Sequence, residues 1–156
     1  MQETNALRNR IRDAACAFTY ETFEKGHVSY LEDGASLLET LDSLTAAEAS
    51  APIAESGTSI ASHAEHVRFY VADRIQSFRG EETGEVDWEQ SWKVQTVTAE
   101  QWDALRNALR EAYQELQSVL HGFETWEIEG QAWGAIAVVA HSAYHLGAIR
   151  LALQKG

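Results

Sequence analysis

The sequence predicts an all-α protein, a four-helix bundle with one extra short helix, and three observations support this. Apolar residues recur every three or four positions along four long segments, which is the spacing of one helix face. Serine or threonine precedes several of these segments, with glutamate or glutamine three positions later, the pattern of a capping box. The chain has a single proline, Pro52, and few alternating runs of β-branched residues, so long strands are not expected.

The first long helix is expected at about residues 5–24. Its apolar stripe consists of Leu7, Ile11, Ala14 and Phe18. An irregular connector at 27–34 follows it. The extra short helix comes next, because Ser36 and Glu39 have capping-box spacing and precede a run of leucines at positions 37, 38, 41 and 44.

The second long helix is expected after an Ala/Ser-rich loop around Pro52 and Gly57, with Thr58 or Ser59 as its cap. Its stripe consists of Ile60, Ala64, Val67, Val71, Ile75 and Phe78. A long connection at 80–97 carries Trp88 and Trp92. We expect the five tryptophans of the chain in the core or in loop packing rather than as platforms for a substrate.

Thr98 and Gln101 form a second capping-box pair, which opens the clearest helix of the chain. The stripe of this third long helix consists of Trp102, Leu105, Leu109, Ala112, Leu116 and Val119. A turn at 122–130 leads into the last helix, at 132–153. The connections at 25–34 and 80–97 are long for neighbouring antiparallel helices, so they allow a crossover topology.

Length and charge limit the classes of function. We expect one domain spanning 1–156. The 24 acidic and 12 basic residues give a net charge of −12, which repels phosphate backbones, so no nucleic-acid partner is expected. No apolar run appears long enough to span a membrane and residues 1–12 are polar, so we expect no membrane partner and a cytoplasmic location. The single cysteine, Cys16, excludes an intrachain disulfide and is expected as buried packing.

Two histidines, His141 and His145, stand four residues apart in the apolar last segment. On a helix this spacing places both imidazoles on one side, within reach of one metal ion. Six histidines in a chain of this length give roughly 0.2 such pairs by chance, so the spacing alone is modest support. The alternative is a pair of buried histidines hydrogen-bonded to the backbone or to Tyr144. No glutamate follows His141, so the zinc-protease motif is excluded.

A third ligand could come from the second long helix, which carries His63 and His66. At about 100° per residue, His63 lies closer than His66 to the apolar stripe, so the direction of burial favours His63. His27 and His121 stand in or near loops and are expected at the surface. Three neutral imidazoles on a divalent ion would leave at least one position open for chemistry.

Two segments of the chain resemble the DinB/YfiT-like superfamily of metal-dependent helical bundles: GTSIASHAEHV at 57–67 and AHSAYHLGAIR at 140–150. The resemblance spans essentially the whole chain. It implies that one histidine of the second helix, directly before an aliphatic residue, joins the pair of the last helix on a divalent ion. His66, followed by Val67, fits that position together with His141 and His145. His63 is then an alternative ligand or a neighbour of the site.

The resemblance implies zinc or nickel as the cofactor, with iron or manganese as alternatives, since imidazole accepts several of these ions. Relatives in that superfamily transfer low-molecular-weight thiols such as bacillithiol or mycothiol, and others are called hydrolases. We therefore expect a homodimeric metal-dependent thiol transferase or hydrolase that acts on a small thiol or electrophile. No carboxylate is placed as a general base, so no catalytic residue is predicted and the enzymatic character stays open. The alternatives are a non-catalytic metal-binding bundle with a stress-related role and a dimeric interaction module.

Overall fold

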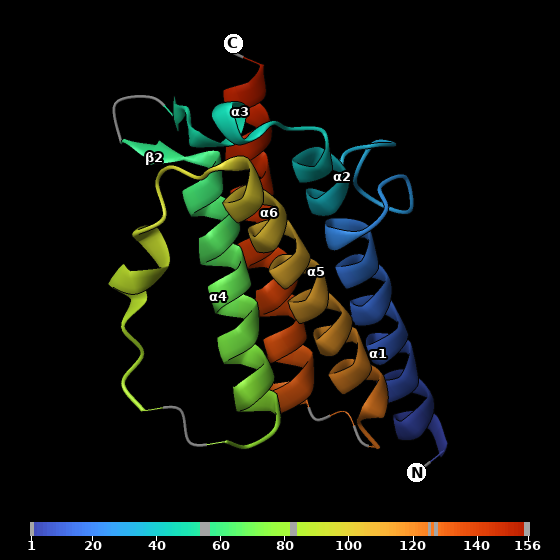
Figure 1. Cartoon of the computed structure of the whole chain (residues 1–156). Helices are drawn as coiled ribbons and strands as arrows, with labels where there is room; N and C mark the ends of the chain where they lie inside the picture. The colour runs from blue at the N-terminus through green and yellow to red at the C-terminus, as the bar shows by residue number, and fades with distance from the viewer. Residues whose placement is uncertain (1, 54–56, 82–83, 125, 127, 155–156) are drawn as a thin grey trace.

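Four long helices make up most of the molecule. The computed structural model describes residues 2–53, 57–81, 84–124, 126 and 128–154. The long helices are α1 (Gln2–Phe23), α4 (Ile60–Phe78), α5 (Ala99–Gly122) and α6 (Trp133–Leu153). α1 packs against α5 and α6, and α4 packs against the same two helices. α1 and α6 run upwards in Figure 1, whereas α4 and α5 run downwards. The all-α prediction is confirmed in this coarse form.

The region between α1 and α4 differs from the prediction. It holds two short helices, α2 (Leu37–Asp42) and α3 (Ala46–Ser50), where one was expected. A capping box of Thr45 and Glu48 starts α3. A two-stranded antiparallel sheet, β1 (Pro52–Ile53) and β2 (Thr58–Ser59), was not expected, because strands of two residues are too short to show an alternating pattern. Residues 54–56 of the predicted loop lie outside the described residues.

The connection between α4 and α5 runs back beside α4 to the end of the molecule where α5 begins (Figure 1). It contains a 3-10 turn, η2 (Trp88–Trp92), which packs against α4. A π-helical turn, η3 (Ile128–Ala132), leads into α6. Residues 82–83 of this connection, and residues 125 and 127 of the predicted turn before α6, are not described.

The predicted capping boxes are confirmed. Ser36 with Glu39 starts α2, and Thr98 with Gln101 starts α5. Of the two candidate caps of α4, Ser59 accepts the first-turn N–H, from Ser62. These helices begin where the sequence places them because capping depends on residues only three positions apart.

The stripes predicted for α4 and α5 form the core. Ile60, Ala64, Val67, Val71 and Ile75 of α4 are buried, as are Trp102, Leu105, Leu109, Ala112 and Leu116 of α5. α6 approaches α4 closely at Gly134, where an added Cβ would lie 2.5 Å from the ring of Phe78. This close approach brings α6 against the histidine-bearing face of α4.

The stripe predicted for the first helix is wrong. Leu7 and Phe18 are 56% and 39% exposed. The buried face of α1 instead contains Ala15, Thr19 and Phe23. Thr19 tolerates this burial because its hydroxyl donates to the Ala15 carbonyl at 2.7 Å. A prediction based on the apolar residues alone therefore assigned the wrong face of α1 to the core.

The connector after α1 is organised around the carboxylate of Glu21, which is fully buried. It accepts N–H groups from Val28, Ser29, Tyr30 and Leu31. Burial alone would raise the pKa of Glu21, but these four hydrogen bonds lower it to about 2. The carboxylate thus supplies the hydrogen-bond acceptors that these four N–H groups would otherwise find in a regular helix or strand.

One helix of the described residues, Gly130–Leu153, is long and apolar enough to cross a membrane by length and composition. This differs from the expectation that no segment reaches that length. The helix packs against α1 and α4, although only 28% of its most apolar window is buried, and it is a single such helix among the described residues. Its length and composition are therefore weak support for a membrane span and compatible with a soluble protein.

Candidate metal centre

Two helices bring four histidines together: His63 and His66 from α4, and His141 and His145 from α6. His66, His141 and His145 each offer one ring nitrogen, and these three atoms lie within 4.8 Å of one another. Nε2 of His141 is 3.1 Å from Nε2 of His66 and 3.3 Å from Nε2 of His145. Zinc–nitrogen bonds of about 2.0–2.1 Å in tetrahedral geometry place ligand nitrogens roughly 3.3 Å apart. The two separations from His141 match this spacing, and the third pair, His66 with His145, lies within 4.8 Å, so the three rings are close enough to bind one ion.

Ser91 of η2 fixes the orientation of His66. The Ser91 hydroxyl donates to the Trp88 carbonyl at 2.6 Å, and its oxygen lies 2.7 Å from Nδ1 of His66. Because the hydroxyl proton is already used, Nδ1 of His66 is the donor of the second bond. Nε2 of His66 is then left with a free lone pair that faces the other histidines. Trp92 stacks on the same ring, with 4.1 Å between centroids.

His63 lies behind His145 rather than with the three converging nitrogens. The Nδ1 atoms of the two rings are 2.9 Å apart, so one ring donates and the other accepts. When His145 donates, its Nε2 keeps a lone pair directed at His141. The direction of burial could not separate the two candidates of α4, because His63 and His66 are both 8% exposed.

His141 lies on the open side of the cluster. It is half-buried, whereas His66 and His145 are 8% and 5% exposed. Its ring stacks on Tyr70 with 3.8 Å between centroids, and its buried Nδ1 has no hydrogen-bond partner among the described residues. Tyr144, which is 73% exposed, meets His145 edge-on beside it. A small molecule would therefore approach from the His141 side.

The cluster is uncharged at neutral pH. Burial, and then the neighbouring His66, lower the pKa of His141 to about 4. Burial, and then the neighbouring histidines, lower the pKa of His145 to about 3. The pKa values of His63 and His66 are also lowered, mainly by burial. Neutral imidazole is the form that binds metal ions. Without an ion, Nε2 of His141 can donate its proton toward Nε2 of His66 or of His145. A bound cation would replace that proton at the point where the three nitrogens meet.

Several residues around the cluster were not identified from the sequence. No sequence pattern identified Ser91, because its hydrogen bond to His66 depends on how the 80–97 connection folds. Trp92 was expected only in core or loop packing, yet its ring stacks on His66 and forms one wall of the cluster. Tyr70, which stacks on His141, forms another. Among the described residues, no carboxylate is hydrogen-bonded to a histidine of the cluster.

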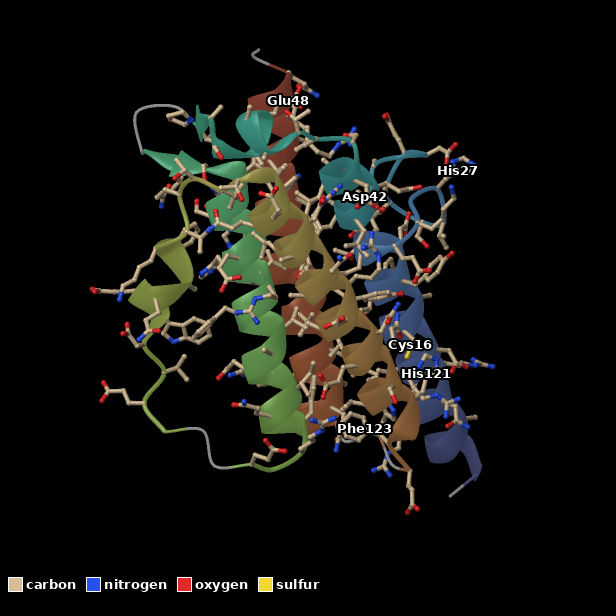
Figure 2. All side chains as sticks on the ribbon, viewed as in Figure 1. Cys16, His27, Asp42, Glu48, His121 and Phe123 are labelled. Atoms are coloured by element: carbon tan, nitrogen blue, oxygen red, sulfur yellow. The ribbon has the colours of Figure 1, made fainter. Side chains whose placement is uncertain are left out.

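The remaining predictions for single residues hold with one exception. His27 and His121 are exposed and lie away from α4 and α6, on the connector after α1 and at the end of α5 (Figure 2). Cys16 is buried in the core, and this burial raises the pKa of its thiol. Trp133 departs from the packing role expected of the tryptophans, since 63% of it is exposed.

Comparison of the chain with protein-family models, curated proteins and solved structures gives no match. The resemblance to the DinB/YfiT-like superfamily therefore remains a prediction from the two histidine segments.

Proposed function

We propose that His66, His141 and His145 bind one divalent transition-metal ion, with zinc or nickel as the leading candidates. We further propose that the chain is a DinB/YfiT-like four-helix bundle with crossover topology and acts as a metal-dependent thiol transferase or hydrolase. The observation that carries the proposal is the convergence of three neutral ring nitrogens from two helices.

An ion held by three neutral imidazoles keeps its full positive charge and lowers the pKa of a thiol or water molecule bound to it. Zinc and nickel also accept soft thiolate ligands readily. A thiol activated in this way needs no general base from the protein, which agrees with the absence of a hydrogen-bonded carboxylate among the described residues around the cluster. Transfer would join the sulfur to an electrophilic carbon, whose leaving group departs with its electron pair, while the thiol proton passes to solvent.

The surrounding side chains would position this chemistry rather than take part in it. Ser91 holds the ring of His66, and His63 holds the ring of His145, each through Nδ1. Such contacts fix the tautomer and the orientation of a metal-binding histidine. Trp92 and Tyr70 exclude water from two sides, so the thiol would enter beside His141.

The deep burial of His66 and His145 favours a second candidate function. An ion enclosed by these rings would tie α4 to α6 and stabilise the bundle without turnover, as in a metal-binding protein with a stress-related role. A structural ion would raise the thermal midpoint on loading but leave no exchangeable ligand.

The two candidates separate in one experiment on protein purified without a histidine tag. The chelated protein is reloaded with Zn²⁺ or Ni²⁺ and assayed with several low-molecular-weight thiols and chlorodinitrobenzene as the electrophile. We expect turnover that requires the metal and is lost in His141→Gln but kept in His121→Gln, a matched change of an exposed histidine. Metal-dependent stabilisation without turnover would support the structural ion, and absence of stoichiometric metal binding would refute both.

A further inference from the structure

A row of side chains on α4 leads from the histidine cluster to a hollow farther along the same helix. Tyr70 and Arg74 follow His66 at intervals of four residues, which places the three on one face of the helix. The guanidinium carbon of Arg74 lies 5.6 Å from the centre of the Tyr70 ring, and that ring stacks on His141 with 3.8 Å between centroids. The guanidinium carbon is therefore at most 9.4 Å, the sum of these distances, from the centre of the His141 ring.

The hollow lies between α4 and the start of α6 and measures about 300 Å³. Arg74 and Ser77 line it from α4, and Trp133 and Gly134 line it from α6. Trp133 is 63% exposed, and an indole at the edge of a site offers both a ring face and an N–H donor. The volume is at the lower end of the ~300–1,000 Å³ of small-molecule sites. We call this site the Arg74 hollow.

Arg74 supplies the only charge that lines the Arg74 hollow among the described residues. Its Nε donates to Oδ2 of Asp73 at 2.9 Å, and its Nη2 donates to the same oxygen. Nη1 has no hydrogen-bond partner in the described part of the chain, and a third of the side chain is exposed. A guanidinium carries five N–H groups, so Nη1 and part of Nη2 remain available. That edge matches the two oxygens of a carboxylate.

We propose that the Arg74 hollow binds the carboxylate of a small-molecule substrate of the metal centre. The substrate lies along Tyr70, with its reacting atom beside His141 and its carboxylate against Nη1 of Arg74. One guanidinium that already pairs with Asp73 suits a singly charged carboxylate better than a phosphate, which needs more donors. The assignment to a substrate rests on the proposed function, whereas the binding of a carboxylate needs no metal.

The first test titrates the chelated full-length chain with benzoate and follows the indole N–H signals by NMR, with Trp133→Phe to assign the signal of Trp133. Because no metal is present, the result does not depend on the proposed function. We expect a saturable shift of the Trp133 signal with benzoate and none with benzyl alcohol, a neutral molecule of similar size. Inorganic phosphate should bind more weakly than benzoate. No saturable shift with benzoate, or tighter binding of phosphate, would overturn the proposal.

Variants of the Asp73–Arg74 pair give changes of opposite sign. Asp73→Asn removes the carboxylate that competes for Arg74, so benzoate should bind a few-fold more tightly. Adding Arg74→Gln in that background should weaken binding by at least about 10-fold, because a charge-assisted hydrogen bond is lost. This double variant leaves no unpaired carboxylate at residue 73, so it avoids a buried charge that could prevent folding. Arg79→Gln, a change of an exposed arginine at the end of α4, should leave the affinity unchanged. Equal affinity in all variants would overturn the proposal.

The second test identifies which substrate carries the carboxylate. The zinc-loaded protein is assayed with two pairs that differ by this group: chlorodinitrobenzene and chlorodinitrobenzoate as electrophiles, and mercaptoethanol and mercaptopropionate as thiols. In the Asp73→Asn background, Arg74→Gln should raise KM at least about 10-fold for the carboxylate-bearing member of one pair and leave kcat and the neutral members unchanged. The pair that responds is the source of the carboxylate, and no response in either pair would overturn the role in substrate choice. No turnover with any of the four would refute the proposed function, while the benzoate titration decides the Arg74 hollow by itself.

Discussion

Replacing Ser91 with alanine tests whether the connection between α4 and α5 is part of the metal centre. Ser91 is fully buried, and its oxygen is the acceptor for Nδ1 of His66 at 2.7 Å. The alanine variant leaves that N–H buried without a partner and frees the ring to rotate. An unsatisfied buried donor costs about 1–3 kcal/mol.

Loss of a partner that orients a metal-binding histidine lowers metal affinity by about 10–100-fold. This range equals about 1.4–2.8 kcal/mol of binding free energy. We therefore expect Ser91→Ala to bind Zn²⁺ about 10–100-fold more weakly than the wild type. The assay is competition with a chromophoric zinc chelator, at a temperature where circular dichroism shows that both proteins are folded.

Ser118→Ala is the matched control, because Ser118 is exposed on α5, away from the cluster. Its zinc affinity should equal that of the wild type. A Ser91→Ala variant that is folded and binds zinc within twofold of the wild type would refute the role of this hydrogen bond.

Three further predictions concern stability. Glu21→Gln should lower the free energy of unfolding by about 2–4 kcal/mol in urea titrations, because the amide cannot replace a carboxylate that accepts four N–H groups; an unchanged midpoint would contradict this. Gly134→Ala should destabilise the fold by about 1–3 kcal/mol through its contact with Phe78, and Phe78→Leu should relieve part of that loss. The pKa values of His141 and His145 are lowered to about 4 and about 3, so the unfolded chain binds more protons below pH ~6.5. The thermal midpoint of the chelated protein should therefore fall as the pH is lowered from about 6.5 to 4.5, before Glu21 titrates, and His145→Gln should flatten this dependence.

The parts of the fold that depend on local spacing could be predicted from the sequence. The caps Ser59 and Thr98 and the stripes of α4 and α5 are encoded within a few residues, and the structure has them where they were expected. The face of α1 was not predictable from hydrophobicity, since Thr19 is buried while Leu7 is exposed.

The candidate site was predictable only in part, for a similar reason. Helical spacing brought His141 and His145 to one face, but two histidines of α4 face the same region and are equally buried. In the structure His66, and not His63, has a ring nitrogen close to those of His141 and His145. Its ring is held in that orientation by contacts with Ser91 and Trp92. Those residues come from a connection whose conformation is set by tertiary packing, so no local pattern in the sequence could show them.

The most direct test of the metal centre is X-ray absorption at the zinc edge of the untagged, zinc-loaded protein. We expect one zinc ion per chain with three imidazole nitrogens at about 2.0–2.1 Å, and the loss of one imidazole from the spectrum of His141→Gln. A spectrum with fewer than three imidazoles in the wild type, or one that His141→Gln leaves unchanged, would contradict the assignment of His66, His141 and His145 as the ligands.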